Sequence, residues 1–278
     1  MIDTHCHLSL KDKNLDDVIK KMNNDIIIVS GADHESNKEV ITLCNKYPNV
    51  YGTIGLHPDE ANTYKQEYLD FIEKNIANKK IVGIGEIGLD YYYSKENKDK
   101  QIKLFEQQIS IALKYNKPIV VHSRDAANDT YEIMKNNNVE KIKSVIHCYS
   151  YSIEMAYNFI KLKSMLGIGG VVTFKNGTKL KEVVKQIDLN NLLLETDSPY
   201  LAPEPLRGTK NEPFNIIYVA REIAKIKNIS EEEVLKQTTL NAVHQFDLNL
   251  DLWYNFIVYK NRGELNGWIF ATIVWKIY

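Results

Sequence analysis

Eight short apolar runs, each followed by a stretch with helical periodicity, constrain the fold of this chain more than any other feature. The runs are rich in isoleucine, valine and leucine and cover residues 1–5, 25–30, 50–56, 80–89, 118–121, 144–146, 165–168 and 192–194. Amphipathic stretches between them include residues 15–22, 68–76, 99–114, 151–160 and 180–186. Continuous apolar runs are typical of strands that are buried on both faces of a parallel sheet.

The repeat predicts an α/β protein with a (β/α)8 TIM-like barrel. Eight strand-then-helix units within about 250 residues fit a closed barrel better than an open doubly wound sheet. No G-x-G-x-x-G follows the first run, which argues against a dinucleotide site. Ser230 and Glu233 form a capping-box signature for a last helix, expected to run to about Phe246. We therefore expect a single domain at 1–248 and an appended tail of unknown role at 249–278.

Composition narrows the function classes only in part. The formal net charge of −1 gives no general attraction for nucleic acid, so a phosphate-handling site would have to be built locally. Cys6, Cys44 and Cys148 form no C-x-x-C pair, and the N-terminus lacks a basic-then-apolar signal segment. Both observations favour a cytoplasmic protein with reduced thiols. No apolar run reaches the length of about 18 residues that a membrane span needs.

Histidines and carboxylates interrupt the apolar pattern at the ends of predicted strands. His5 and His7 alternate at the end of the first strand, so both can point to one face while Cys6 points to the other. The remaining residues of this kind are His57, Glu86, His122, His147 and Asp197. The carboxyl ends of barrel strands converge on one face, where barrel active sites are built. We therefore expect these distant residues to be neighbours.

This set of side chains predicts a metal site. One histidine after an apolar strand is more often structural than a ligand, but histidines or carboxylates at so many strand ends are hard to explain in that way. His34 and His244 lie in or beside predicted helices and are left out of the site. The donors exceed what one tetrahedral ion needs and suit two divalent ions sharing a carboxylate. Mixed nitrogen and oxygen donors leave Mg, Mn and Zn open.

Seven motifs in order make the chain similar to the TatD family of metal-dependent deoxyribonucleases. They are D-T-H-C-H at 3–7, G-L-H-P at 55–58, G-E-I-G-L-D-Y at 85–91, H-S-R at 122–124, H-C-Y-S at 147–150, E-T-D-S-P-Y at 195–200 and R-G-T-K-N-E-P at 207–213. The resemblance runs from the first strand to about Asp247. It implies a barrel of the amidohydrolase type and a metal-dependent hydrolase that cleaves phosphodiester bonds of DNA, in an exonucleolytic manner.

The resemblance also assigns roles to individual positions. His5 and His7 would hold one metal ion, and His122 and His147 would hold the second. Glu86 would bridge the two ions, and Asp197 would bind metal and orient or deprotonate the attacking water. His57 would contact the substrate phosphate. Arg124 and Arg207 fall inside two of the motifs, and phosphate contact by both is our own hypothesis. For Arg207, a loop-anchoring pair with Glu204 or Glu212 is an equal alternative, and Glu195 would support a metal-binding histidine.

Other functions stay open at this point. A related hydrolase could cleave an amide or ester with the same donors, although such enzymes often bridge their metals with a modified lysine where this chain has Glu86. A non-catalytic metal or nucleic-acid binding barrel is the other alternative. Such degeneration usually removes a ligand or the water-activating acid, and both are present here. DNA is the expected substrate and RNA is possible, while the oligomeric state is left open.

Overall fold

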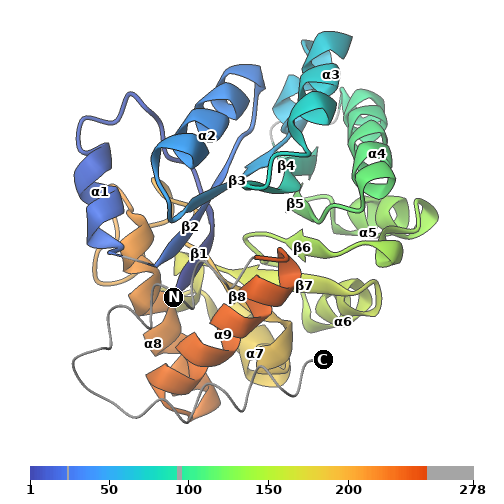
Figure 1. Cartoon of the computed structure of the whole chain (residues 1–278). Helices are drawn as coiled ribbons and strands as arrows, with labels where there is room; N and C mark the ends of the chain where they lie inside the picture. The colour runs from blue at the N-terminus through green and yellow to red at the C-terminus, as the bar shows by residue number, and fades with distance from the viewer. Residues whose placement is uncertain (24, 93–95, 249–278) are drawn as a thin grey trace, which may run out of the picture.

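The computed structural model describes residues 1–23, 25–92 and 96–248, so the expected tail at 249–278 lies outside the described residues. Eight parallel strands form one sheet in which each strand pairs with the next along the chain (Figure 1). The strands are β1 (Ile2–Cys6), β2 (Ile26–Ser30), β3 (Val50–Ile54), β4 (Ile81–Asp90), β5 (Ile119–Arg124), β6 (Ser144–Ile146), β7 (Ser164–Ile168) and β8 (Leu192–Leu194). The predicted barrel is confirmed.

Helices follow the strands and surround the sheet (Figure 1). They are α1 (Leu15–Lys21), α2 (His34–Lys46), α3 (Gln66–Asn75), α4 (Lys98–Tyr115), α5 (Ala127–Asn136), α6 (Ile153–Lys161), α7 (Thr178–Gln186), α8 (Ile216–Lys227) and α9 (Glu231–Gln245). The Ser230 hydroxyl accepts a hydrogen bond from the backbone N–H of Glu233, 3.1 Å away, and caps α9 as predicted. His34 begins α2 and its ring stacks on Tyr68, so its exclusion from the predicted metal site agrees with its place in the fold.

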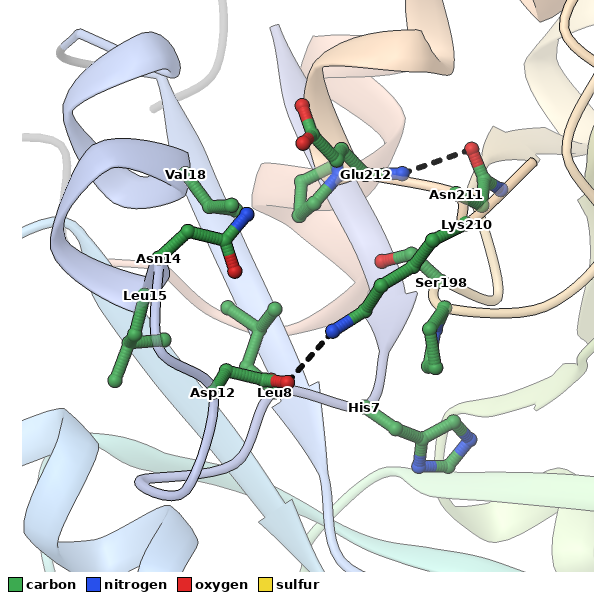
Figure 2. A pocket seen from close by; sticks show the side chains of 12 residues that line it. His7, Leu8, Asp12, Asn14, Leu15, Val18, Ser198, Lys210, Asn211 and Glu212 are labelled. Atoms are coloured by element: carbon green, nitrogen blue, oxygen red, sulfur yellow. Dashed lines mark hydrogen bonds and ion pairs between the residues drawn. The ribbon is translucent and has the colours of Figure 1, made fainter.

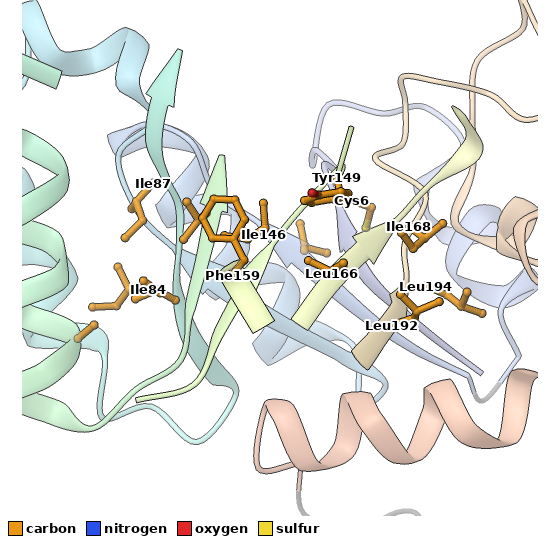
Figure 3. Packing of buried hydrophobic residues seen from close by; sticks show 14 of the residues in the cluster. Cys6, Ile84, Ile87, Ile146, Tyr149, Phe159, Leu166, Ile168, Leu192 and Leu194 are labelled. Carbon is orange, nitrogen blue, oxygen red and sulfur yellow. The ribbon is translucent and has the colours of Figure 1, made fainter. Parts of the chain in front are cut away.

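Two buried clusters explain why the strands are apolar on both faces. The larger cluster lies between the strands and the surrounding helices. Figure 3 shows part of it, with Leu166 and Ile168 of β7, Leu192 and Leu194 of β8, and Phe159 of α6. Alternate side chains of each strand belong to different faces, so this layer accounts for only half of each run.

The second cluster comes from the other face of the strands. Its members are Ile2, Ile26, Ile28, Tyr51, Val82, Val120, Val145 and Leu193, together with Ala242, Phe246 and Leu248. The strand residues fill the interior of the barrel, and α9 and the residues after it close its floor. Lys143, immediately before β6, pairs with Asp247 at 2.6 Å, which places this floor at the amino ends of the strands. The floor therefore lies opposite the face on which the predicted site residues converge.

Several strands differ in extent from the prediction. β3 ends at Ile54 and not at Leu56. β4 continues to Asp90 and β5 to Arg124, so Glu86 and His122 lie inside their strands and not after them. Beyond the end of β3, the backbone bonds to buried amide side chains and no longer to a neighbouring strand. Asn37 of α2 exchanges two hydrogen bonds with the backbone of Gly55, and Gln108 of α4 does the same for Leu56. These amides satisfy backbone groups that would otherwise be buried without partners.

The barrel closes between β8 and β1 through the segment that follows β8. The backbone N–H of Asp197 donates to the carbonyl oxygen of His5 at 2.9 Å, and the N–H of His7 donates to Ser198 O at 2.6 Å. The buried carboxylate of Asp3 accepts bonds from the backbone N–H and the hydroxyl of Thr196. Closure of the barrel thus places Asp197 beside the two histidines of the first strand.

Among the described residues, no helix combines the length and apolar character that crossing a membrane requires.

The floor of the barrel can be tested by removing its largest side chain. Phe246 is 2% exposed, and Phe246→Ala leaves a cavity between α9 and the strands, so we expect the free energy of unfolding to fall by about 3–5 kcal/mol. Urea denaturation followed by circular dichroism measures this loss. Tyr157→Ala, at a tyrosine that is 46% exposed, is the control and should change the value by less than about 0.5 kcal/mol. Equal effects of the two variants would contradict the proposed packing.

Candidate metal centre

The buried carboxylate of Glu86 is the centre of the site. It is 4% exposed and lies in β4, with histidines on both sides. Its Oε1 is 2.6 Å from His122 Nδ1 and 2.7 Å from His147 Nε2. Its Oε2 is 3.4 Å from His5 Nε2 and 3.5 Å from His7 Nε2. One carboxylate therefore presents a different oxygen to each of two histidine pairs.

Asp197 completes the half of the site formed by the first strand. Its Oδ1 lies 3.7 Å from His5 Nε2 and 3.5 Å from His7 Nε2. The two histidine Nε2 atoms are 3.2 Å apart, so both rings point to the same place, as the alternation in D-T-H-C-H predicts. Cys6 instead packs into the outer cluster, with its Sγ 3.7 Å from Ile28 O. The prediction that Cys6 faces away from the two imidazoles is confirmed.

The outward ring nitrogens of the first two histidines are held by a single residue, Ser30 at the end of β2. Its hydroxyl is 3.0 Å from His5 Nδ1, and its carbonyl oxygen is 3.0 Å from His7 Nδ1. Thr53 of β3 holds the hydroxyl in turn, at 2.8 Å. A carbonyl oxygen can only accept, so His7 carries a proton on Nδ1, and Nε2 is the nitrogen that faces the centre and can bind a cation.

His147 has a different neighbour on its outward side. Its Nδ1 is 3.8 Å from Glu195 Oε1, too long for a hydrogen bond, and this nitrogen has no hydrogen-bond partner. Glu195 is fully buried and accepts a bond from the backbone N–H of Cys148. Burial raises the pKa of Glu195 to about 7. Glu195 thus lies where the sequence predicts a supporting carboxylate, and its support of His147 remains a prediction.

The charges of the site shift the titration of its members in opposite directions. Burial alone would raise the pKa of Glu86, but the charge of His147 and the hydrogen bonds from His122 and His147 outweigh it and hold that pKa well below its usual range. Burial lowers the pKa of His5 to about 4. Burial would also lower the pKa of His7, but the hydrogen bond to Asp197 and the charge of Glu86 raise it to about 9. The charge of Glu86 likewise outweighs burial at His147 and raises its pKa to about 9.

His57 lies beside this cluster, at the end of the β3 segment. Its Nε2 is 3.9 Å from Glu86 Oε1. Its Nδ1 lies 3.3 Å from the backbone nitrogen of Asp59 and 3.2 Å from the carboxylate of the same residue, so Nδ1 faces Asp59 and Nε2 faces the cluster. This arrangement fits a group that contacts an anion next to the centre.

The two predicted arginines lie at the exposed carboxyl end of the barrel. The guanidinium of Arg124, the last residue of β5, lies over the ring of Tyr92 at 3.7 Å. Arg207, in the loop after β8, lies over the ring of Phe174 at 4.3 Å. Glu212, one of the two alternative partners for Arg207, pairs with Lys21 at 2.6 Å. Phosphate contact by either arginine remains a prediction.

A pocket opens beside His7, between the loop after β1 and the R-G-T-K-N-E-P loop (Figure 2). Lys210 crosses from the second loop to Asp12 in the first, with its Nζ 2.6 Å from the carboxylate. Asn211, at the back of this pocket, is buried and donates to the backbone oxygens of Thr196 and Tyr200. The amide of Asn211 is therefore an anchor for the segment that carries Asp197.

The donor set fits divalent cations. In the described part of the chain, three groups of potential ligands have their donor atoms within 4.8 Å of one another: His5 with Glu86 and His147, His5 with His7 and Asp197, and His57 with Asp90 and His122. Imidazole nitrogens and carboxylate oxygens are the donors that Zn and Mn share, and carboxylates suit Mg as well. All six predicted ligands therefore lie together.

Two residues around the site were missed by the sequence analysis, Asp90 and Ser30. Asp90 Oδ2 is 2.9 Å from His122 Nε2. Glu86, Gly88 and Asp90 alternate along β4 and so share a face, which would have indicated Asp90 if the strand had been predicted to its full length. Ser30 ends an apolar run as the histidines do, but a lone serine gives no comparable signal.

The comparisons with known proteins agree with this geometry. Residues 2–247 match the family described as TatD related DNase. The chain is 40% identical to YabD of Bacillus subtilis strain 168, described as an uncharacterized metal-dependent hydrolase, over 90% of this chain and 100% of that protein. Among solved structures, the TatD homologue YJJV from Escherichia coli K12 has a TM-score of 0.83 at 26% identity, covering 90% of this chain and 98% of that one. A hydrolase of the TatD family from Entamoeba histolytica has a TM-score of 0.77 at 27% identity, covering 88% and 97%.

Proton release on metal binding tests the electrostatics of the centre. His7 and His147, with pKa values of about 9, are protonated at pH 7, and both must lose the proton to bind a cation. We expect at least about two protons to be released per protein at pH 7, since hydrogen bonds to Asp90 and Glu86 outweigh burial and raise the pKa of His122 as well, and fewer as the pH approaches 9. Calorimetric titration with Zn²⁺ in buffers of different ionisation enthalpy measures the number. Release of no protons at pH 7 would show that both imidazoles are already neutral.

The same raised pKa values affect the metal-free protein. The folded state holds these two protons up to about pH 9, whereas a histidine of the unfolded chain loses its proton near pH 6.5. The resulting stabilisation is fully present below pH 6.5 and is lost as the pH rises through 9. Urea denaturation of the metal-free protein at pH 7 and pH 10 should show the larger free energy of unfolding at pH 7, and the opposite order would contradict the assignment.

Proposed function

The chain belongs to the TatD related DNase family of metal-dependent hydrolases, and on that premise we propose that it hydrolyses phosphodiester bonds of DNA at a centre of two divalent ions. One observation carries the proposal: Glu86 places one carboxylate oxygen against His5 and His7 and the other against His122 and His147. A shared carboxylate with histidines on each oxygen is the arrangement that two neighbouring cations need.

The residues divide between two cation positions. The first would be held by His5, His7 and Asp197 with one oxygen of Glu86, and the second by His122 and His147 with the other oxygen. Two such ions, when bound, make water a stronger acid and neutralise charge on a phosphoryl oxygen. The ions can be Mg, Mn or Zn, since the donor set admits all three.

Asp197 is the residue that takes the proton from the attacking water. Burial would raise its pKa, but the hydrogen bond from His7 and the charge of His147 outweigh it and hold the pKa below the usual value. The carboxylate is therefore ionised and able to accept a proton at neutral pH. The backbone bond from Asp197 to His5 O fixes its position relative to the first strand.

His57, Arg124 and Arg207 would bind the phosphate groups of the substrate. The Nε2 of His57 lies next to the cluster, 3.9 Å from Glu86 Oε1, and when it carries a proton it can donate to a phosphate oxygen. Each guanidinium group lies over an aromatic ring at the carboxyl ends of the strands, and a guanidinium can contact a phosphate through two N–H groups at once. They supply local positive charge in a chain whose net charge is −1.

A related hydrolase that cleaves an amide or ester is the second candidate. It would use the same donors, because the geometry of the ligands does not distinguish a phosphoryl from a carbonyl substrate. The family description and the arginines near the site favour phosphodiesters.

Substitution of Asp197 tests the proposed chemistry. Asp197→Asn keeps the shape of the side chain but removes the proton acceptor, so we expect kcat on a DNA oligonucleotide to fall by about 10²–10⁴-fold. Asp188→Asn is the matched control, because Asp188 precedes β8 at the opposite end of the barrel and its side chain caps a short turn. The protein is stripped of metal, refilled with Mg²⁺, Mn²⁺ or Zn²⁺, and the products are separated by electrophoresis.

The substrate panel separates the two candidate functions. It contains single- and double-stranded DNA, an RNA oligonucleotide, and chromogenic esters and amides. Stepwise shortening of DNA from one end supports the exonuclease. Hydrolysis of an ester or amide with no cleavage of any oligonucleotide by any metal form would replace the proposal with the second candidate. Equal activity of the wild type and the Asp197 variant would remove the role given to that residue.

A further inference from the structure

The imidazole of His122 lies between two carboxylates of the same strand. Its Nδ1 is 2.6 Å from Glu86 Oε1, and its Nε2 is 2.9 Å from Asp90 Oδ2. Glu86 faces the cluster of histidines, whereas Asp90 lies on the outward side of the ring. A carboxylate on that side accepts the Nε2–H, so Nδ1 is the nitrogen that can bind a cation at the centre.

Gly88 makes this arrangement possible. It lies midway between Glu86 and Asp90 on the same face of β4, and it pairs with His122 across the sheet. A Cβ at this position would be 1.9 Å from His122 O, and the φ angle of Gly88 is +142°. Glycine thus lets the two strands approach, so that one imidazole of β5 can reach both carboxylates of β4.

The carboxylate of Asp90 is held in place from several directions. Its Oδ1 accepts a hydrogen bond from the backbone N–H of Tyr92 at 2.9 Å. The backbone N–H and carbonyl of Asp90 both bond to the side-chain amide of Gln101, each at 2.9 Å. β3 ends before it reaches Asp90, so the buried side chain of Gln101 in α4 makes the hydrogen bonds that the backbone of β3 would otherwise make. A carboxylate fixed in this way can dictate the orientation of the ring next to it.

We propose that Asp90 is a positioning residue that fixes the tautomer and orientation of His122, so that its Nδ1 binds the second of the two cations. The inference rests on the proposed two-metal centre but not on the substrate, because orienting the ring is the same task for any bond that is hydrolysed. Asp90 acts through His122 and does not touch the reacting atoms. It makes His122 the counterpart of His5 and His7, whose outward nitrogens are held by Ser30.

The test compares metal binding by four forms of the full chain, titrated with Zn²⁺ under calorimetric observation. Asp90→Asn keeps the side chain's shape but removes its charge, and we expect it to weaken one of two binding steps by about 10–100-fold. Ser30→Ala, which removes the hydroxyl on His5, should weaken the other step. Asp59→Asn is the matched control: this carboxylate also lies 3.2 Å from an imidazole, that of His57, but is exposed, and the variant should bind both ions as the wild type does.

A spectroscopic measurement on the wild type tests the tautomer of His122 directly. In the Zn²⁺-loaded protein with ¹⁵N-labelled histidine, the His122 ring should show its proton on Nε2 and none on Nδ1, with the signal assigned by its loss in His122→Gln. The proton on Nδ1 would overturn the inference.

The titration outcomes are distinguishable. Two binding steps in the wild type that are unchanged in Asp90→Asn would overturn the role of Asp90 and leave the two-metal proposal intact. A single binding step in the wild type would instead count against the two-metal centre itself. A third outcome is that the wild type binds a further ion that is lost only in Asp90→Asn. Asp90 would then be a ligand together with His57 and His122, and its positioning role would also be overturned.

Discussion

A carboxylate buried at the mouth of a barrel is the constraint on which the rest of this structure depends. A charge such as that of Glu86 is costly to remove from water unless partners compensate for it, and here nitrogens of four histidines from three strands converge on its two oxygens. Each histidine then needs its own outward support, which most of them find in Ser30 or Asp90. The histidines thus stabilise the buried charge of Glu86, and Ser30 and Asp90 in turn hold the histidines.

Closure of the barrel and assembly of the site are one structural event. β8 is short, and the chain that leaves it bonds to the end of β1 through Asp197 and Ser198, while Asp3 holds Thr196 between them. The first and last strands of a barrel are distant in sequence, and only the closed form brings the histidines of one to the carboxylate of the other. A substitution that breaks the hydrogen bonds between β1 and the segment after β8 would therefore affect stability and metal binding together.

The sequence predicted the barrel and the ligand cluster because both leave local signals. Apolar runs mark the strands, and His5, His122 and Asp197 interrupt or end them where parallel strands converge. Asp90 and the true end of β4 were not predicted, because that part of the strand pairs only with β5 and its other edge is satisfied by Gln101, eleven residues on. Such long-range amide contacts have no periodicity to detect. The anchoring role of Asn211 was hidden for the same reason.

The floor of the barrel has a consequence for how this protein tolerates additions. Phe246 and Leu248 seal the interior at the amino ends of the strands, while every residue of the cation cluster lies at the carboxyl ends. The described part of the chain therefore ends, at Leu248, on the side of the barrel opposite the candidate metal centre. Surface positions on this side are the ones at which an affinity tag, a fused partner or a solid support can be attached with least interference with the donor side chains.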